Sequence, residues 1–126
     1  MSDLNPNKAQ HYLYEVHPSR SVPDDAVEAL LRGDTARPSK PVADNAANED
    51  VQIVAEHLEY LQDLVRKKVV ILFGRTLNKD ERPPYGIVIF AAASDQEARQ
   101  IMENDPAIKR GLAAASLYPY QVVGRS

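Results

Sequence analysis

The sequence predicts an α+β domain of the ferredoxin-like type, βαββαβ, in which a four-stranded antiparallel sheet carries its helices on one face. Two observations support this fold class. Short runs of branched and aromatic residues, each the length of a strand, alternate with two longer stretches of helical periodicity. Once one short helical stretch near the N-terminus is set aside, the order of the elements is the split βαβ pattern.

The composition of the chain argues against several classes of function and partner. The chain has 126 residues, a length typical of one domain with its own core. It contains no cysteine, which excludes disulfides and thiolate chemistry and suits the cytoplasm, where we expect the protein to work. The formal net charge is -3 with both signs mixed, so we expect no nucleic-acid partner. The apolar runs are too short to cross a membrane, so no membrane partner is expected either.

The N-terminal part divides into a leader, a strand and an insertion. Residues 1–9 are polar and predict a disordered leader, followed by a single domain over 10–126. The aromatic and aliphatic run His11–Val16 (HYLYEV) predicts the first strand. An inserted segment at about 19–50 then combines a short helix over Asp24–Leu31 with a long irregular loop over Asp34–Asn48.

The strongest helical periodicity predicts a helix over Glu49–Lys68. Its main apolar face consists of Val51, Val54, Ala55, Leu58, Leu61 and Val65. A second, narrower stripe lies about a quarter of a turn or more away and consists of Ile53, His57, Tyr60 and Leu64. Because this stripe is apolar and aromatic where a surface helix would be charged, it favours a pocket beside His57.

The C-terminal half predicts the remaining elements in a compact order. They are a strand over Val69–Phe73, a polar loop over Gly74–Pro84, a strand over Tyr85–Ala91, a helix opening at Ser94, a short turn over Pro106–Gly111 and a strand over Ala115–Val123. Ser94 and Glu97 have the spacing of a capping box. Pro119 cannot donate a ladder hydrogen bond, so the last strand is expected at a sheet edge or with a bulge.

One face of such a sheet lacks helices to cover it. An apolar sheet face is unfavourable in water, and two copies that pack face to face would bury it. We therefore expect a homodimer through the open sheet face.

Several segments together resemble the YCII-related (YciI-like) family of dimeric α/β-barrel proteins. The matching segments are HYLYEV at the first strand, HLEYLQDL at His57–Leu64, VVILFG ending at Gly74, SDQEA at Ser94–Ala98, NDPAIKRGL at Asn104–Leu112 and YPYQVV at Tyr118–Val123. The resemblance covers nearly all predicted elements but not the inserted segment. The chain departs from the family pattern at Val54 and Arg75, where members often have Arg and Pro.

The resemblance implies a His–Asp pair as the active site, which corresponds here to His57 and Asp105. Histidine can take or give a proton near neutral pH, and an aspartate within hydrogen-bond reach would fix its tautomer and stabilise the imidazolium. Each residue also has a structural interpretation. His57 can be a packed core residue, and Asp105 before Pro106 has the position of a helix N-cap. For Asp105 the roles are compatible if one carboxylate oxygen caps while the other faces His57.

Four further residues are candidates for substrate binding. Tyr60, Tyr118 and Tyr120 could shape a pocket or donate a hydrogen bond, although core or dimer-interface roles would also explain them. Tyr118 and Tyr120 share a face of a regular strand. Arg75, in the loop after the second strand, could bind an anionic substrate or be a solvated loop charge. No histidine has metal-ligand spacing to a second ligand, so we expect no metal and no cofactor.

Two functions remain open at this point. The first is an enzyme that uses the His–Asp pair for acid–base chemistry on a small molecule, in a lyase, isomerase or dehalogenase-type reaction. One branch of the family includes chloromuconolactone dehalogenases. The alternative is a non-catalytic dimeric module for ligand binding or interaction. A haem-binding or oxygenase relative of the same fold would instead require an open apolar pocket with a histidine facing it.

Overall fold

The structure is a computed structural model that describes residues 10–19, 45–78 and 83–124. The predicted leader at 1–9, the predicted helix over Asp24–Leu31 and most of the predicted insertion lie outside these residues. In the part of the chain that is described, no helix is long and apolar enough to cross a membrane.

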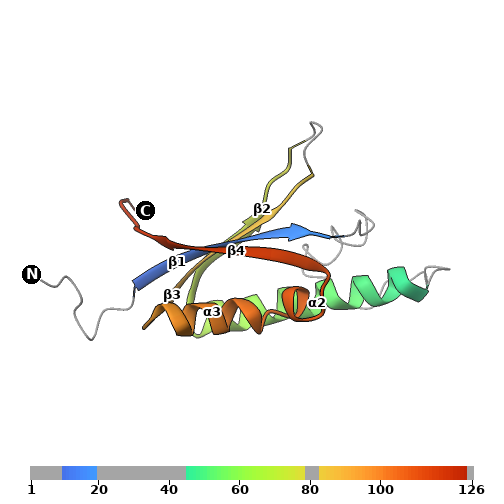
Figure 1. The fold of residues 1–126 in the computed structure, drawn as a ribbon, viewed down its shortest axis with the longest axis horizontal. Helices are drawn as coiled ribbons and strands as arrows, with labels where there is room; N and C mark the ends of the chain where they lie inside the picture. The colour runs from blue at the N-terminus through green and yellow to red at the C-terminus, as the bar shows by residue number, and fades with distance from the viewer. Residues whose placement is uncertain (1–9, 20–44, 79–82, 125–126) are drawn as a thin grey trace, which may run out of the picture.

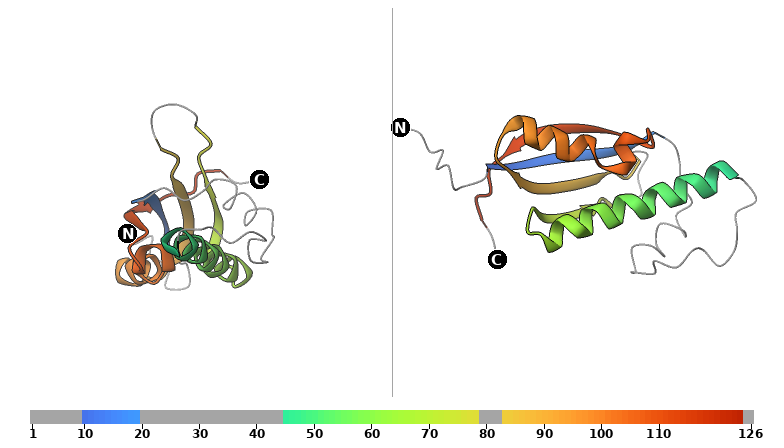
Figure 2. Two further views of the ribbon diagram at one scale, coloured as in Figure 1. Left: turned by 90° about the vertical axis from the view of Figure 1, so that its right-hand side faces the viewer. Right: turned by 90° about the horizontal axis from the view of Figure 1, so that it is seen from below.

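The described chain forms a four-stranded antiparallel sheet with its helices on one face (Figures 1 and 2). The elements in order are β1 (Gln10–Pro18), α2 (Asn45–Arg66), β2 (Val70–Arg75), β3 (Gly86–Ala92), α3 (Asp95–Glu103), α4 (Pro106–Lys109) and β4 (Ala113–Tyr120). The strands lie side by side in the order β2-β3-β1-β4. This is the ferredoxin-like α+β architecture, and the predicted fold class is confirmed.

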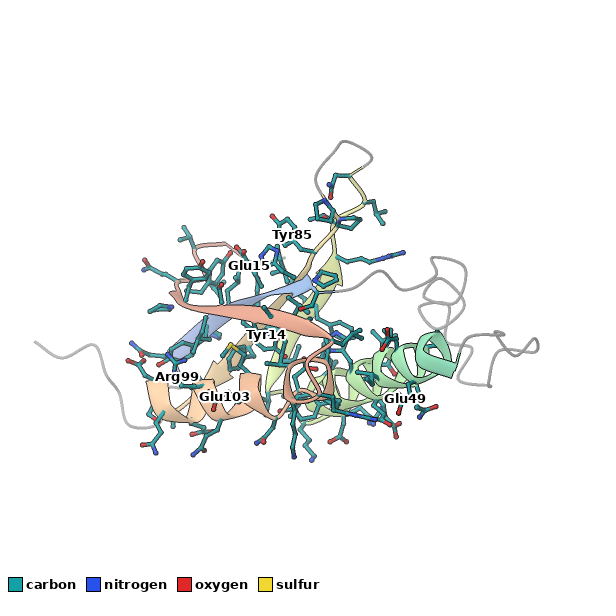
Figure 3. All side chains as sticks on the ribbon, turned by 45° about the vertical axis from the view of Figure 1, so that its right-hand side comes forward. Tyr14, Glu15, Glu49, Tyr85, Arg99 and Glu103 are labelled. Atoms are coloured by element: carbon teal, nitrogen blue, oxygen red, sulfur yellow. The ribbon has the colours of Figure 1, made fainter. Side chains whose placement is uncertain are left out.

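Strand β1 lies in the middle of the sheet and pairs with β3 on one side and β4 on the other. Its side chains alternate as a two-residue period requires: Tyr12, Tyr14 and Val16 are buried under the helices, and the residues between them face the other way. Figure 3 shows this alternation, with Tyr14 on the helix side and Glu15 on the opposite side. The centre of the core is therefore built on β1.

Helix α2 begins earlier than the sequence predicted, and both of its predicted apolar stripes contribute to the core. It starts at Asn45, so the last residues of the predicted loop are helical. Ile53, from the stripe that contains His57, is 4% exposed, and so is Val51 from the predicted main face. Val65, at the end of that main face, is 40% exposed. Leu61, also from the predicted main face, is fully buried. The packed face of α2 therefore draws on both stripes, with Ile53 and Leu61 in the core.

Local interactions explain where α2 ends and where α3 begins. Helix α2 stops at Arg66 because Lys68 adopts a left-handed conformation with φ 62°, and the Val69 amide donates back to the Leu64 carbonyl at 2.9 Å. At the start of α3 the Ser94 hydroxyl accepts a hydrogen bond from the Glu97 amide at 3.1 Å, as the predicted capping box requires.

Strand β4 forms one edge of the sheet, as the proline within it predicted. Pro119 lies opposite Tyr12 in the register, and Tyr118 and Tyr120 lie opposite Leu13 and His11. Because Leu13 and His11 are on the face of β1 away from the helices, both tyrosines of β4 are on that face too.

The face of the sheet away from the helices is largely apolar, and no described helix lies on it (Figure 2). Its apolar residues are Leu13, Leu72, Ile87, Ile89, Tyr118 and Tyr120. We refer to this surface as the open sheet face. Leu72, Tyr118 and Tyr120 are its most exposed members, at 52%, 48% and 41%.

Candidate active site

Asp105 sits in the connection between α3 and α4. Its backbone is extended, with φ −60° and ψ 124°, and Pro106 occupies the first position of α4, where a missing amide hydrogen costs nothing. The Asp105 side chain accepts a hydrogen bond from the Ala107 amide at 3.0 Å, so the predicted N-cap is present. The whole residue is 0% exposed, which is unusual for an aspartate and requires partners for both carboxylate oxygens.

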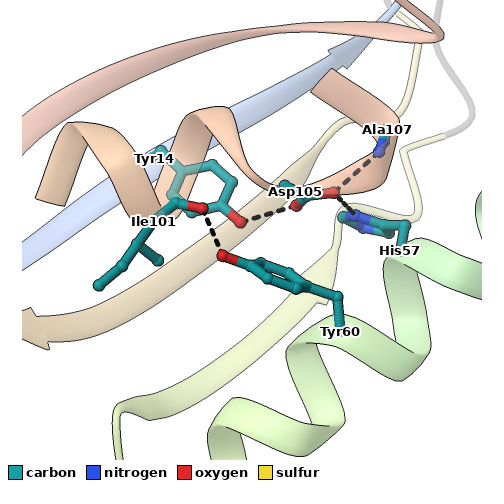
Figure 4. A network of polar contacts seen from close by, with 6 residues as sticks. All are labelled: Tyr14, His57, Tyr60, Ile101, Asp105 and Ala107. Carbon is teal, nitrogen blue, oxygen red and sulfur yellow. Dashed lines mark hydrogen bonds and ion pairs between the residues drawn. The ribbon is translucent and has the colours of Figure 1, made fainter. Parts of the chain in front are cut away.

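Those partners come from three separate elements (Figure 4). The Oδ1 atom of Asp105 lies 2.6 Å from Nδ1 of His57 on α2 and also accepts the Ala107 amide of α4. The Oδ2 atom accepts the Tyr14 hydroxyl of β1 at 2.7 Å. The two roles of Asp105 are present together, through one oxygen rather than two: Oδ1 makes both contacts, and Tyr14 occupies Oδ2.

His57 faces this carboxylate from α2, and its side chain retains 16% of its exposure. The contact to Asp105 uses Nδ1. A carboxylate is an acceptor, so the short distance favours the tautomer with the hydrogen on Nδ1, which leaves Nε2 as the atom that can accept a proton. Within the described residues, no hydrogen-bond partner is recorded for Nε2 of His57.

Two tyrosine hydroxyls complete the polar cluster. The Tyr60 hydroxyl donates to the Ile101 carbonyl at 2.7 Å, which ties α2 to α3. Burial raises the pKa of Tyr60 to about 12, and the negative charge of Asp105 adds to this shift. Burial raises the pKa of Tyr14 far above its usual value, and the charge and hydrogen bond of Asp105 raise it further. Both phenols are therefore neutral donors at any physiological pH.

The structure brings together only part of the predicted site. His57, Asp105 and Tyr60 lie side by side (Figure 4). Arg75 is the last residue of β2 rather than a loop residue, and it shares the helix side of the sheet with Phe73.

Tyr118 and Tyr120 are on the open sheet face, away from the His–Asp pair. Tyr120 lines an open depression there together with His11.

Tyr14 is the member of the cluster that sequence reasoning missed. The available signal was the alternation in HYLYEV, which places Tyr12 and Tyr14 on one face of the first strand. A tyrosine that is buried nearly always finds a partner for its hydroxyl, so each of these residues implied a buried acceptor. Tyr12 meets that rule with Asp95, whose Oδ1 accepts its hydroxyl at 2.6 Å.

Across residues 10–19, 45–78 and 83–124, no group of three or more His, Cys, Asp or Glu side chains is placed to hold a metal ion. The polar cluster is instead built from one carboxylate, one imidazole and two phenols, a set suited to proton transfer and hydrogen bonding.

Comparisons with known proteins address the family. No curated protein matches the sequence. Among solved structures, the chain is similar to the 5-chloro-2-hydroxyhydroquinone dehydrochlorinase of Burkholderia phenoliruptrix, determined in complex with 2,5-dihydroxybenzoquinone. The identity is 21%, the alignment covers 87% of this chain and 93% of that chain, and the TM-score is 0.49. The model of the YCII-related domain matches residues 35–120. Since this match covers more than half of the sequence, the chain belongs to the family of YCII-related domains.

Proposed function

We propose that the chain is an enzyme in which His57, held by Asp105, transfers a proton to and from a small molecule. The observation that carries this proposal is the 2.6 Å contact between a fully buried carboxylate and an imidazole that keeps partial exposure. A purely structural pair would gain nothing from the remaining access to His57. The same pair in an enzyme requires it, because the substrate must reach Nε2.

The reaction classes that suit one such base are elimination and isomerisation next to a carbonyl. Nε2 of His57 takes a proton from the carbon beside the carbonyl, and the electron pair of that C–H bond forms a new double bond. In a lyase or dehalogenase-type step, a leaving group such as halide departs with its bonding pair. In an isomerase, the proton returns to another carbon of the same molecule. The Asp105 carboxylate stabilises the imidazolium between these steps.

Tyr60 and Arg75 are the proposed substrate-binding residues on the helix side of the sheet. The Tyr60 hydroxyl donates its hydrogen to Ile101, so its oxygen can accept a hydrogen bond from a substrate while its ring lines the site. A guanidinium can bind an anionic group. For Tyr118 and Tyr120, the placement on the open sheet face favours a role in the dimer interface instead. We propose that the enzyme works in the cytoplasm, which the absence of cysteine suits.

The test is a screen of small carbonyl compounds against the wild-type chain and His57→Ala. The compounds are tested with and without a halide on the carbon next to the one that loses its proton. Halide release and the ultraviolet absorbance of new double bonds report the two reaction classes. We expect turnover by the wild type and a loss of at least about a hundredfold in His57→Ala, the lower range of general acid–base catalysis. Equal turnover by both chains would exclude His57 as the base.

A matched control is available in His17. Its Nε2 atom lies 2.8 Å from Oε1 of Glu15, so it also forms a His–carboxylate pair, but on the face of the sheet away from the helices. His17→Ala removes such a pair without touching the proposed site, and we expect it to retain the wild-type turnover. If His17→Ala and His57→Ala lose activity to the same extent, the loss reports a general defect rather than catalysis at His57.

The second proposal concerns assembly: two copies associate through the open sheet face. Leu72 and Tyr118 lie on this face about half exposed, at 52% and 48%, which is costly for large apolar side chains in water. Light scattering at micromolar concentration should give twice the chain mass of 14.0 kDa. Leu72→Glu should shift the mass to that of a single chain, whereas Leu77→Glu, an exposed position in the loop after β2, should not. A wild-type chain of monomeric mass would exclude the dimer.

A further inference from the structure

The orientation of the Asp105 carboxylate needs more than its cap. The torsion that rotates a carboxylate is broad and roughly two-fold, so it has no strong preference of its own. Ala107 and His57 both contact Oδ1, on one side of the group. A carboxylate held by one oxygen can still tilt about that contact, and the line from Oδ1 to His57 tilts with it.

The Tyr14 hydroxyl holds the other oxygen. It donates to Oδ2 of Asp105 at 2.7 Å, and both residues are 0% exposed, so water does not compete for the contact. The phenol itself is firmly placed. Tyr14 lies in the central strand of the sheet, and its ring meets that of Phe90 edge to face, with centroids 5.6 Å apart. The hydroxyl therefore reaches Asp105 from the most rigid part of the fold.

We infer that Tyr14 is a positioning residue for the His–Asp pair: by fixing Oδ2 it keeps Oδ1 of Asp105 aimed at Nδ1 of His57 and so keeps Nε2 free to act as the base. Tyr14 acts through Asp105 rather than on a substrate. This inference rests on the proposed function for its catalytic consequence, but the tautomer of His57 that it fixes can be measured without any substrate.

The experiment measures the ¹⁵N chemical shifts of the His57 imidazole, which distinguish a protonated from an unprotonated ring nitrogen. In the wild type, Nδ1 should carry the hydrogen and Nε2 should not. In Tyr14→Phe, the population of the other tautomer should rise about 2- to 10-fold, the ratio that matches the net contribution of one hydrogen bond. The same His57 signals in Tyr14→Phe and in the wild type would overturn the inference.

Tyr12→Phe is the matched control. Tyr12 lies two residues earlier on the same face of β1, is 1% exposed, and donates to a different carboxylate, Asp95, at 2.6 Å. The Tyr12→Phe variant therefore also removes a buried tyrosine hydroxyl that donates to an aspartate, but this hydroxyl does not contact the His57–Asp105 pair. We expect the His57 signals to stay unchanged in this variant. If Tyr12→Phe alters them as much as Tyr14→Phe, a general loosening of the core is the cause and positioning by Tyr14 is excluded.

A second measurement does not depend on the folding of Tyr14→Phe. In the wild type, the hydroxyl proton of Tyr14 should exchange slowly with solvent, and Asp105→Asn should move its resonance while that of Tyr12 stays in place. Fast exchange, or no response to Asp105→Asn, contradicts the contact. Failure of the proposed function can be distinguished from failure of this inference. If the wild type is inactive but His57 has the expected tautomer, Tyr14 is still the positioning residue, but of a structural pair.

Discussion

Replacing Asp105 with alanine tests whether one carboxylate joins three parts of the fold. The change removes the N-cap of α4, which contributes about 1 kcal/mol, and leaves the buried Tyr14 hydroxyl without an acceptor, which costs about 1–3 kcal/mol. The contact to His57 is lost as well. Together these losses predict a decrease of about 3–5 kcal/mol in the free energy of unfolding, a large fraction of the 5–15 kcal/mol typical of a domain.

The size of the decrease in the free energy of unfolding should distinguish Asp105 from its partner His57. His57→Ala removes one of the hydrogen bonds to Asp105 but leaves the cap and the Tyr14 contact intact, so we expect a smaller decrease of about 1–2 kcal/mol. Asp95→Ala serves as a control, because it also removes a carboxylate that accepts a tyrosine hydroxyl, but an exposed one. Its cost should stay below about 1 kcal/mol, because the Tyr12 hydroxyl can still donate to Oε1 of Gln10 at 3.0 Å.

Urea unfolding followed by far-ultraviolet circular dichroism measures all of these variants under the same conditions. The slope of the free energy against urea should stay the same, so that the midpoints compare directly. If Asp105→Ala costs no more than His57→Ala, the carboxylate does not hold the three elements together, and the reasoning from its burial is refuted.

Three further changes test local causes in the same assay. The pKa of Tyr60 is about 12 in the folded chain and about 10 when unfolded, so its contribution to the free energy of unfolding is complete below pH 10 and is lost as the pH rises toward 12. Tyr60→Phe should make this alkaline loss of stability shallower, and an unchanged loss would contradict the shift. Lys68→Gly should raise stability by about 0.5–1 kcal/mol, because φ 62° suits glycine better, and a loss would speak against that conformation. Gly111→Ala, at φ 77°, should lower stability by about 1–2 kcal/mol, and a gain would contradict the positive φ.

Much of the fold follows from local patterns in the sequence. The strands, the cap of α3 and the edge position of β4 depend on neighbours within a few residues, which is why HYLYEV, the Ser94–Glu97 spacing and Pro119 were informative. The same holds for the cap at Asp105, because an aspartate before a proline favours a helix start wherever it occurs.

The orientation of α2 could not be read in the same way. Two stripes of apolar residues lie beside each other on this helix, and counting their members favours the wider one. Packing takes part of each stripe: Ile53 and Leu61 are buried, while Val65 near the helix end stays exposed. Tyr14 was missed for a related reason: its partner is 91 residues away in the sequence, and only the assembled sheet brings β1 under α4.

The distances in sequence between the three partners also bear on how the chain folds. Tyr14 and Asp105 are separated by 91 residues, and His57 and Asp105 by 48. Closing loops of this size costs entropy before any contact offsets it, and such topologies fold more slowly than those with local contacts. During synthesis, the first strand leaves the ribosome long before the aspartate that it needs. We therefore expect the Tyr14 hydroxyl to stay hydrated until the C-terminal part of the chain has been synthesised. We expect the candidate site to be among the last features to form.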